Sequence, residues 1–355
     1  MLSFNAKKHY FCIIEAEYNI THSLESKKKI LAVINPISGT DNKEYVPETI
    51  VRVIDSSRYD VTVRFTNRAG HATELTREAI RQGFFGVIAI GGDGTINEVA
   101  SALTDTDVAL GIVPCGSGNG LARHLGIPLT VDNALQVINE MNIQDFDYCK
   151  VNDVPFFCTC GVGFDAHVSD KFAQSTKRGP VTYVKKALAE YLKYRCEEYE
   201  IELPDNSFKE KAFVIACGNA SQYGNNAMIA PHASMHDGLI DVTVIHPFTP
   251  LDTAMLSFLL FTGHIDQDTN IHSFRTSKLT IRRPKPGVMH IDGEPMVMPA
   301  ELHICCIHNG LKIFMPVNAD EPKRSLLGPL ENSFWNFVDA VRNELNIEYI
   351  VYHEI

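Results

Sequence analysis

The stretch Gly86–Val99 reads GVIAIGGDGTINEV and joins a buried strand to a helix through a glycine turn. Gly86–Ile90 is a continuous apolar run, which is typical of a strand covered on both faces, and Ile96–Leu103 has helical spacing. The turn Gly91–Thr95 lets backbone approach a ligand, and the following helix N-terminus favours an anion. For one such turn alone, a simple strand–helix connection with Asp93 or Thr95 as the helix cap is favoured over a phosphate site.

Two further predicted strands end in turns of the same kind. NPISG, residues Asn35–Gly39, closes the strand Ile30–Asn35, and PCGSGNG, residues Pro114–Gly120, closes the strand Ala109–Val113. The carboxyl ends of parallel strands share one edge of a sheet, and ligands bind there. Three such turns together favour a nucleotide-phosphate site. The chain has no Walker A string and no GxGxxG followed by a suitable acidic residue, so a dinucleotide fingerprint is weak.

Composition and charge limit the class of protein. The chain has 355 residues, 45% of them hydrophobic and 21% charged, with a net charge of −11. These values predict a folded chain of two domains and argue against nucleic acid as a partner. No apolar run is long enough to cross a bilayer, and the N-terminus does not resemble a signal peptide. Nine scattered cysteines without CxxC spacing favour free thiols and a cytoplasmic location.

The pattern of predicted elements changes along the chain. Strands and helices alternate over 29–152, which predicts a doubly wound α/β domain. Many short strands follow over 153–318, interrupted by two helical insertions, Val181–Arg195 and Leu251–Gly263, which predicts a β-sandwich-like domain. We expect residues 1–28 to be an N-terminal extension, and the pattern over 319–355 predicts a tail of one amphipathic helix and a short strand.

Two acidic turns lie in the second domain. In HIDGEP, residues His290–Pro295, an Asp and a Glu lie two apart, but Asp-Gly is also a strong hairpin signal, and the residues alone favour a hairpin. SMHDGLID, residues Ser234–Asp241, suits either an Asp-Gly turn or a cation held by oxygen ligands, and both alternatives stay open.

Taken in order, NPISG, GGDGTINEV, GSGNGLA and the late Asp-Gly-Glu resemble the diacylglycerol kinase catalytic-domain superfamily. That superfamily includes bacterial lipid kinases, sphingosine kinases and ceramide kinases, and it is distantly similar to NAD kinases. The resemblance covers Lys29 to Val317. It implies a nucleotide-binding α/β domain, a β-sandwich-like lipid-substrate domain, and an active site in the cleft between them. It also implies ATP and Mg²⁺ as cofactors, and a lipid at a membrane surface, such as the inner face of the cell membrane, as the acceptor.

The resemblance also implies roles for individual residues. Glu294 becomes the proton acceptor, Asp292 its charge partner or an alternative base, and Asp93 a holder of Mg²⁺. Asp165 and Ser169 fall in the acceptor region. A structural Mg²⁺ would take Ser234, Asp237 and Leu239. The nucleotide would contact Asn35, Pro36, Ile37, Ser38, Gly39, Thr66, Gly91, Gly92, Asp93, Gly94, Thr95, Ile96, Asn97 and Ser117.

Two positions depart from the family's patterns and leave the acceptor open. Gly120 stands where bacterial diacylglycerol kinases usually have Asp, and Ser169 stands where sphingosine kinases carry a carboxylate. The basic segment Lys171–Arg195 suits either anionic lipid head groups or an ordinary solvated helix face. An NAD kinase and an inactive nucleotide-binding regulator are the alternative functions, and a homodimer is the oligomer left open.

Overall fold

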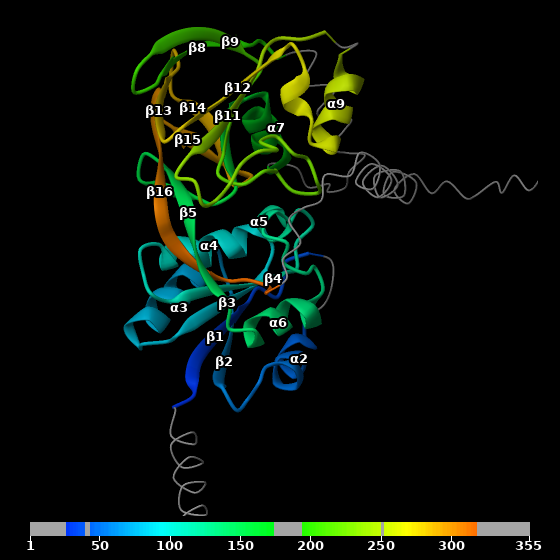
Figure 1. The fold of residues 1–355 in the computed structure, drawn as a ribbon, viewed down its shortest axis with the longest axis vertical. Helices are drawn as coiled ribbons and strands as arrows, with labels where there is room; N and C mark the ends of the chain where they lie inside the picture. Colours follow the sequence, from blue (N-terminus) through cyan, green and yellow to red (C-terminus); the bar gives the residue numbers. More distant parts are fainter. Residues whose placement is uncertain (1–25, 40–42, 174–193, 250–251, 318–355) are drawn as a thin grey trace, which may run out of the picture.

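The computed structural model describes residues 26–39, 43–173, 194–249 and 252–317. The predicted N-terminal extension and C-terminal tail lie outside these residues, except for 26–28, and so does nearly all of the insertion Val181–Arg195. The described chain forms two domains stacked along the long axis of the molecule (Figure 1).

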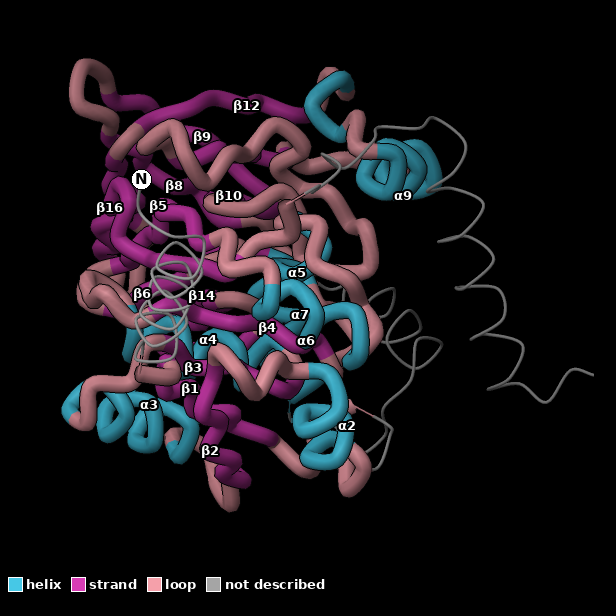
Figure 2. Tube along the Cα trace, turned by 60° about the horizontal axis from the view of Figure 1, so that its bottom comes forward, coloured by secondary structure: helices cyan, strands magenta, loops and turns pink. Residues whose placement is uncertain are grey.

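The first domain is a parallel sheet covered by helices on both faces (Figures 1 and 2). Its strands lie in the order β2-β1-β3-β4, and every neighbouring pair is parallel. α3 and α4 pack together on one face, and α2 and α6 pack together on the other. The strands are β1 (Lys28–Ile34), β2 (Tyr59–Phe65), β3 (Gly86–Gly91) and β4 (Ala109–Pro114), and the helices are α2 (Val46–Val53), α3 (His71–Arg81), α4 (Asp93–Leu103), α5 (Gly120–His124) and α6 (Val131–Asn139).

The second domain packs two sheets against each other. One is antiparallel, with the strands β12 (Ile271–Thr276), β11 (Ile240–Ile245), β10 (Val214–Gly218), β7 (Thr159–Gly163), β14 (Gly287–Ile291) and β15 (Glu294–Met298) in this order. The other contains β5 (Ile143–Val151), β6 (Val154–Phe156), β8 (Glu197–Glu202), β9 (Ser207–Ala212), β13 (Lys278–Arg282) and β16 (Glu301–Phe314). Side chains from both sheets share one buried apolar cluster. The predicted α/β domain followed by a β-sandwich-like domain is therefore confirmed.

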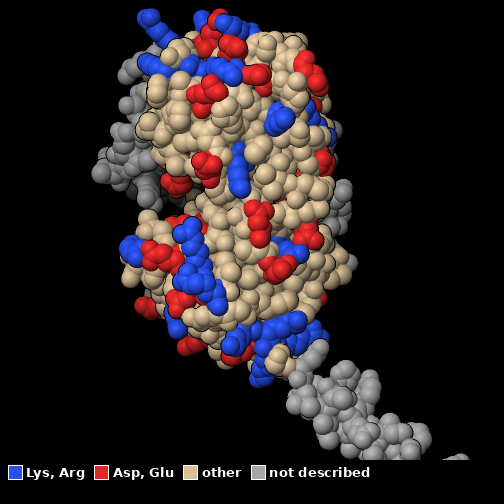
Figure 3. Space-filling view, turned by 90° about the vertical axis from the view of Figure 1, so that its left-hand side faces the viewer, with Lys and Arg blue, Asp and Glu red and all other residues tan. Residues whose placement is uncertain are grey.

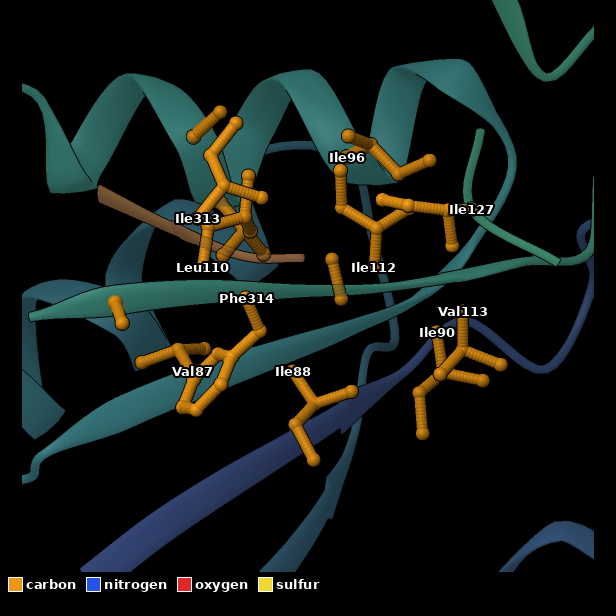
Figure 4. Close-up of a cluster of buried hydrophobic side chains, with 14 of the residues drawn as sticks. Val87, Ile88, Ile90, Ile96, Leu110, Ile112, Val113, Ile127, Ile313 and Phe314 are labelled. Atoms are coloured by element: carbon orange, nitrogen blue, oxygen red, sulfur yellow. The ribbon is translucent and has the colours of Figure 1, made fainter. Parts of the chain in front are cut away.

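Two long strands run through both domains. β16 pairs with β13 in the second domain and, at Ile313, lies parallel to Leu110 of β4 in the first. β5 follows β16 along its length, with a shift of register between Ile307 and Leu311. Ile313 and Phe314 join the apolar core of the first domain on opposite faces of the sheet (Figure 4). The first domain therefore includes a segment from the far end of the chain. The domain boundary near residue 152 stays a prediction.

Several elements have weak signals in the sequence and were not predicted. α2 is only 8 residues long with a proline in its first turn, and β12 is mostly half-buried. α7 (Phe164–Ala173) begins directly after β7 without a loop.

The predicted helical insertion Leu251–Gly263 contains α9 (Thr253–Thr262), which ends at Gly263 in the left-handed conformation. Among the described residues, no helix is both long enough and apolar enough to cross a membrane.

Candidate active site

The turn between β3 and α4 brings backbone amides to the surface at a helix N-terminus. α4 begins at Asp93 after an extended Gly92. The first amides of a helix have no partner within it, so those of Asp93 and Gly94 are suited to hold an anion. A Cβ on Gly94 would meet only the Glu294 carboxylate among neighbouring atoms, with Oε1 at 3.7 Å. The surface above Gly94 therefore has room for a ligand.

The three glycine turns lie against one another, as their positions at strand ends predict. A Cβ on Gly39 would lie 2.2 Å from the Cys115 carbonyl oxygen, and a Cβ on Gly116 would lie 2.7 Å from the Gly92 Cα. Asn35 Nδ2 donates to Thr95 Oγ1 at 3.0 Å. Glycine is thus required at 39 and 116 because the turns pack backbone to backbone.

Asp93 connects the second turn to the third. Its Oδ2 accepts a hydrogen bond from the Asn119 amide at 2.9 Å, and its Oδ1 accepts one from the Gly120 amide at 2.8 Å. Asn119, in the left-handed conformation, immediately precedes α5, so Asp93 satisfies amides at the start of that helix. Gly120, which stands where related kinases usually have Asp, therefore still supplies a hydrogen-bond partner for Asp93, through its backbone amide.

The late Asp-Gly-Glu forms the turn of a hairpin between β14 and β15. Ile291 pairs with Glu294, so Asp292 and Gly293 are the two turn residues, with φ of 47° and 86°. Positive φ at both residues is the geometry that Asp-Gly favours in tight hairpins. The hairpin expected from the residues alone is present, and it also presents both carboxylates at the junction between the domains.

Asp292 ties this hairpin to the first domain. Its Oδ2 accepts hydrogen bonds from Asn97 Nδ2 of α4 at 2.8 Å and from the Phe157 amide at 2.9 Å. Its Oδ1 accepts from the Cys158 amide at 2.8 Å and from the Thr159 amide at 3.0 Å. Burial raises the pKa of Asp292, while these four hydrogen bonds oppose the rise. The carboxylate is occupied as a structural acceptor.

Glu294, two residues later, has the opposite environment. The side chain is exposed, and no hydrogen bond or ion pair joins it to another described residue. Its Oε1 nevertheless points toward Gly94 at the N-terminus of α4. Of the two predicted carboxylates, Glu294 is the one able to accept a proton from a ligand held at this helix end.

The comparisons with known proteins agree with this geometry. Residues 29–151 match the model of the diacylglycerol kinase catalytic domain, and 158–314 match that of the YegS C-terminal NAD kinase beta sandwich-like domain. A protein from Pectobacterium atrosepticum named "Probable lipid kinase YegS-like" is 34% identical over 260 residues, which cover 69% of this chain and 86% of that protein. The chain belongs to the YegS-like lipid kinase family. A relative of the same name from Yersinia pestis is 31% identical over 263 residues, covering 72% of this chain and 87% of the relative.

A solved structure shares this two-domain fold. The crystal structure of a diacylglycerol kinase from Bacillus anthracis superposes with a TM-score of 0.63 at 17% identity, covering 82% of this chain and 98% of that one. The resemblance to the diacylglycerol kinase superfamily is confirmed by the two family models and the curated relatives. The roles of individual residues are not tested by these likenesses and stay predictions.

The remaining nucleotide-binding predictions fall beside the three turns. The Thr66 amide donates to the Ile34 carbonyl at 2.9 Å, so Thr66 lies next to Asn35. Ile37 is 87% exposed, and Ser117 is exposed in the third turn. Glu98, further along α4, faces α3 and not the turns. Its carboxylate accepts hydrogen bonds from the amides of Gly70 and Ala72 at the start of α3.

The side chain of Arg275, on β12, lies beside the predicted structural metal turn Ser234–Asp241. Arg275 Nε bonds Asp241 Oδ1 at 3.0 Å, and Arg275 Nη1 lies 3.8 Å from Asp237 Oδ2. The other oxygen of Asp237 accepts a hydrogen bond from the Leu239 amide. Within the described ranges, no group of three or more His, Cys, Asp or Glu could hold a metal ion. The guanidinium thus lies beside Asp237, one of the predicted ligands. The metal site at Ser234, Asp237 and Leu239 stays a prediction.

The acceptor region contains residues that the sequence did not connect. Asp165, in the first turn of α7, bonds His290 of β14 and Tyr223, while Ser169 lies half-buried one turn further along α7. His290 adjoins the Asp-Gly-Glu, which is a usable signal, but nothing around Tyr223 marks it. Outside the junction, Figure 3 shows Lys and Arg in small groups beside Asp and Glu on the face it presents.

Proposed function

We propose that this lipid kinase transfers the γ-phosphoryl group of ATP, with Mg²⁺, to the hydroxyl group of a neutral membrane-derived lipid. The proposal rests chiefly on one observation, the Glu294 carboxylate that faces Gly94 across the junction between the domains. In this proposal, the nucleotide binds to the first domain and the acceptor lipid binds to the second.

The glycine turns are suited to bind the phosphates of a nucleoside triphosphate. The amides of Asp93 and Gly94 point out of the α4 N-terminus, and the dipole of α4 favours negative charge there. Mg²⁺ takes oxygen ligands and binds chiefly through phosphate oxygens in kinases. Asp93 would contribute through water, since both its oxygens already accept backbone hydrogen bonds. Mg²⁺ would offset the charge that develops on the phosphate oxygens.

The chain's own residues would carry the proton transfer. Glu294 would accept the proton of the acceptor hydroxyl as that oxygen attacks the γ-phosphorus, and ADP would leave with the electrons of the broken phosphorus–oxygen bond. Asp292 would hold the hairpin, and hence Glu294, against α4 through Asn97. The assignment of Glu294 as base over Asp292 follows from the four hydrogen bonds that occupy Asp292.

A neutral acceptor follows from the state of Asp165. Its carboxylate accepts hydrogen bonds from Tyr223, His290 and the Ala166 amide, so it is not available to pair with the amine of a sphingoid base. A glycerolipid alcohol such as diacylglycerol carries no such charge and needs only an apolar pocket and a base. The proposal therefore favours diacylglycerol over sphingosine.

The test is transfer of labelled phosphate from ATP with Mg²⁺ to lipids in mixed micelles. Diacylglycerol, monoacylglycerol, ceramide and sphingosine would be offered separately, with NAD in a parallel reaction and Glu294→Gln as the control. We expect label in diacylglycerol with the wild type and loss of it with Glu294→Gln. Label in sphingosine alone would contradict the neutral acceptor, and label in NAD alone would contradict the lipid kinase activity.

ATP binding without label in any acceptor would instead support a regulator that has lost catalysis. Binding is measured separately by calorimetry on the same preparation. The two readouts together therefore separate a protein that does not bind nucleotide from one that binds it without transfer.

A further inference from the structure

Asp165, His290 and Tyr223 form a hydrogen-bonded network beneath the Asp-Gly-Glu hairpin. His290 Nε2 lies 2.9 Å from Asp165 Oδ2, and the Tyr223 hydroxyl donates to the same oxygen at 3.0 Å. The His290 side chain is only 2% exposed and that of Asp165 14%, so solvent competes little for these bonds. The Tyr223 and His290 rings also meet edge to face, with centroids 5.4 Å apart.

The backbone leaves a space made for this pair of side chains. A Cβ on Gly161 would lie 2.6 Å from Asp165 Oδ2 and 2.8 Å from His290 Nε2. Gly161 is paired with His290 in the β7–β14 ladder, so the two elements cannot move apart to make room. Glycine at 161 is thus required for the imidazole and the carboxylate to meet.

The contacts of His290 indicate which ring nitrogen faces Asp165 with a proton. A carboxylate accepts hydrogen bonds, so Nε2 carries the proton that His290 shares with Asp165. Nδ1 is buried and has no hydrogen-bond partner among the described residues. Asp165 therefore fixes the tautomer and the orientation of the ring.

The network joins three elements that surround the candidate active site. Asp165 belongs to α7 on the acceptor side, and His290 stands two residues before Asp292 in β14. Tyr223 precedes Gly224, where a Cβ would lie 3.0 Å from the Gly118 Cα of the third glycine turn. A contact path thus runs from that turn through Tyr223, Asp165 and His290 to the hairpin that carries Glu294.

We infer that Asp165, His290 and Tyr223 are positioning residues that hold the Glu294 hairpin in register with the phosphate turn. They act through backbone rather than by touching the reacting atoms. The inference rests on the proposed function, because the hairpin matters for catalysis only if Glu294 is the base. It also has a purely structural consequence, which is a hairpin stiffened by α7.

The structural consequence can be tested without any substrate. Asp165→Asn should speed amide hydrogen exchange at Ile291–Glu294, because the network that backs the hairpin is weakened. The matched control is Tyr59→Phe, which removes a tyrosine hydrogen bond to the Ile138 carbonyl in the first domain. Unchanged exchange in the hairpin of Asp165→Asn would overturn the inference whatever the enzyme's activity.

The catalytic consequence uses the milder variant Tyr223→Phe, which keeps the ring and removes one hydroxyl. We expect kcat to fall about tenfold with the KM for ATP unchanged, since misplacing a base slows the chemical step. Adding Tyr223→Phe to Asp165→Asn should cost little more than Asp165→Asn alone, because both act on the same Tyr223–Asp165 hydrogen bond. Wild-type kcat in Tyr223→Phe, or fully additive losses, would contradict the inference. A wild type that transfers no phosphate would overturn the proposed function and leave the exchange result standing.

Discussion

The first-domain side of the junction is built from backbone, whereas the second-domain side is built from side chains. Gly39, Gly92 and Gly116 let three turns pack at van der Waals distance, and the start of α4 supplies the amides. Opposite them, Asp292 and Glu294 stand on a hairpin whose position depends on hydrogen bonds to distant residues. Under the proposed function, the first side would bind the nucleotide phosphates and the second would supply the proton acceptor. The two sides should therefore respond differently to substitution.

A fall in pH should weaken the contact between the two domains more than any single substitution described below. The Ser221 amide of the second domain donates to His124 Nδ1 at the end of α5 at 3.2 Å. Burial lowers the pKa of His124 from 6.5 to about 4, and the nearby His236 adds to this. The unfolded chain therefore binds more protons between these pH values, so stability falls as the pH drops from 6.5 to 4.

The shift corresponds to at most about 3 kcal/mol of unfolding free energy. Urea unfolding of wild type and His124→Gln at several pH values measures it. We expect the variant, whose side-chain oxygen can still accept from Ser221, to lose less stability over this pH range. The control is His303→Gln, because that side chain is 62% exposed. Parallel pH curves for wild type and His124→Gln would contradict the prediction.

Substitutions of the two hairpin carboxylates, Asp292 and Glu294, should separate an effect on stability from an effect on activity. Asp292→Asn turns an amide N–H₂ toward one pair of the four donors that now bond the carboxylate, which should cost about 1–3 kcal/mol of unfolding free energy. Glu294→Gln, on an exposed side chain, should change it by less than about 0.5 kcal/mol. Chemical denaturation of both variants gives the comparison. Equal losses would mean that Glu294 is also structural.

On the backbone side, a single methyl group should be enough to disturb the phosphate turns. Gly116→Ala places a Cβ 2.7 Å from the Gly92 Cα, and backbone must move to relieve the overlap. We expect unfolding free energy to fall by about 1 kcal/mol and ATP affinity to weaken in calorimetry. Gly287→Ala is the control, because its nearest neighbour is a flexible arginine side chain at 3.4 Å. Unchanged ATP affinity in Gly116→Ala would place the nucleotide elsewhere.

Metal removal should have the smallest effect on the folded state. Arg275 already pairs with Asp237 and Asp241, so a chelator should shift the Tm of the nucleotide-free protein by less than about 1 °C. The same chelator should abolish phosphate transfer, because Mg²⁺ would accompany the nucleotide. A clear fall in Tm on chelation would show that the turn Ser234–Asp241 does hold a structural metal.

The sequence predicts the backbone side well because its signals are local. Apolar runs that end in glycine turns specify strands, turns and helix starts without knowledge of the rest of the chain. The second side depends on contacts between residues far apart, such as Asn97 with Asp292 and Asp165 with His290. No spacing rule predicts that Asp292 is fully occupied while Glu294 remains exposed. The return of β16 to the first domain is equally long-range, and Ile313 gives no local sign of it.

The most direct test of the division between the two sides is one variant measured in two ways. In Glu294→Gln, ATP affinity is determined by calorimetry and phosphate transfer to diacylglycerol under single-turnover conditions. We predict an ATP Kd within about twofold of wild type and a transfer rate lower by about 10²–10⁴, the usual contribution of a general base. Transfer at the wild-type rate would contradict the assignment of Glu294, and an equal loss of ATP affinity would contradict the separation of binding from chemistry.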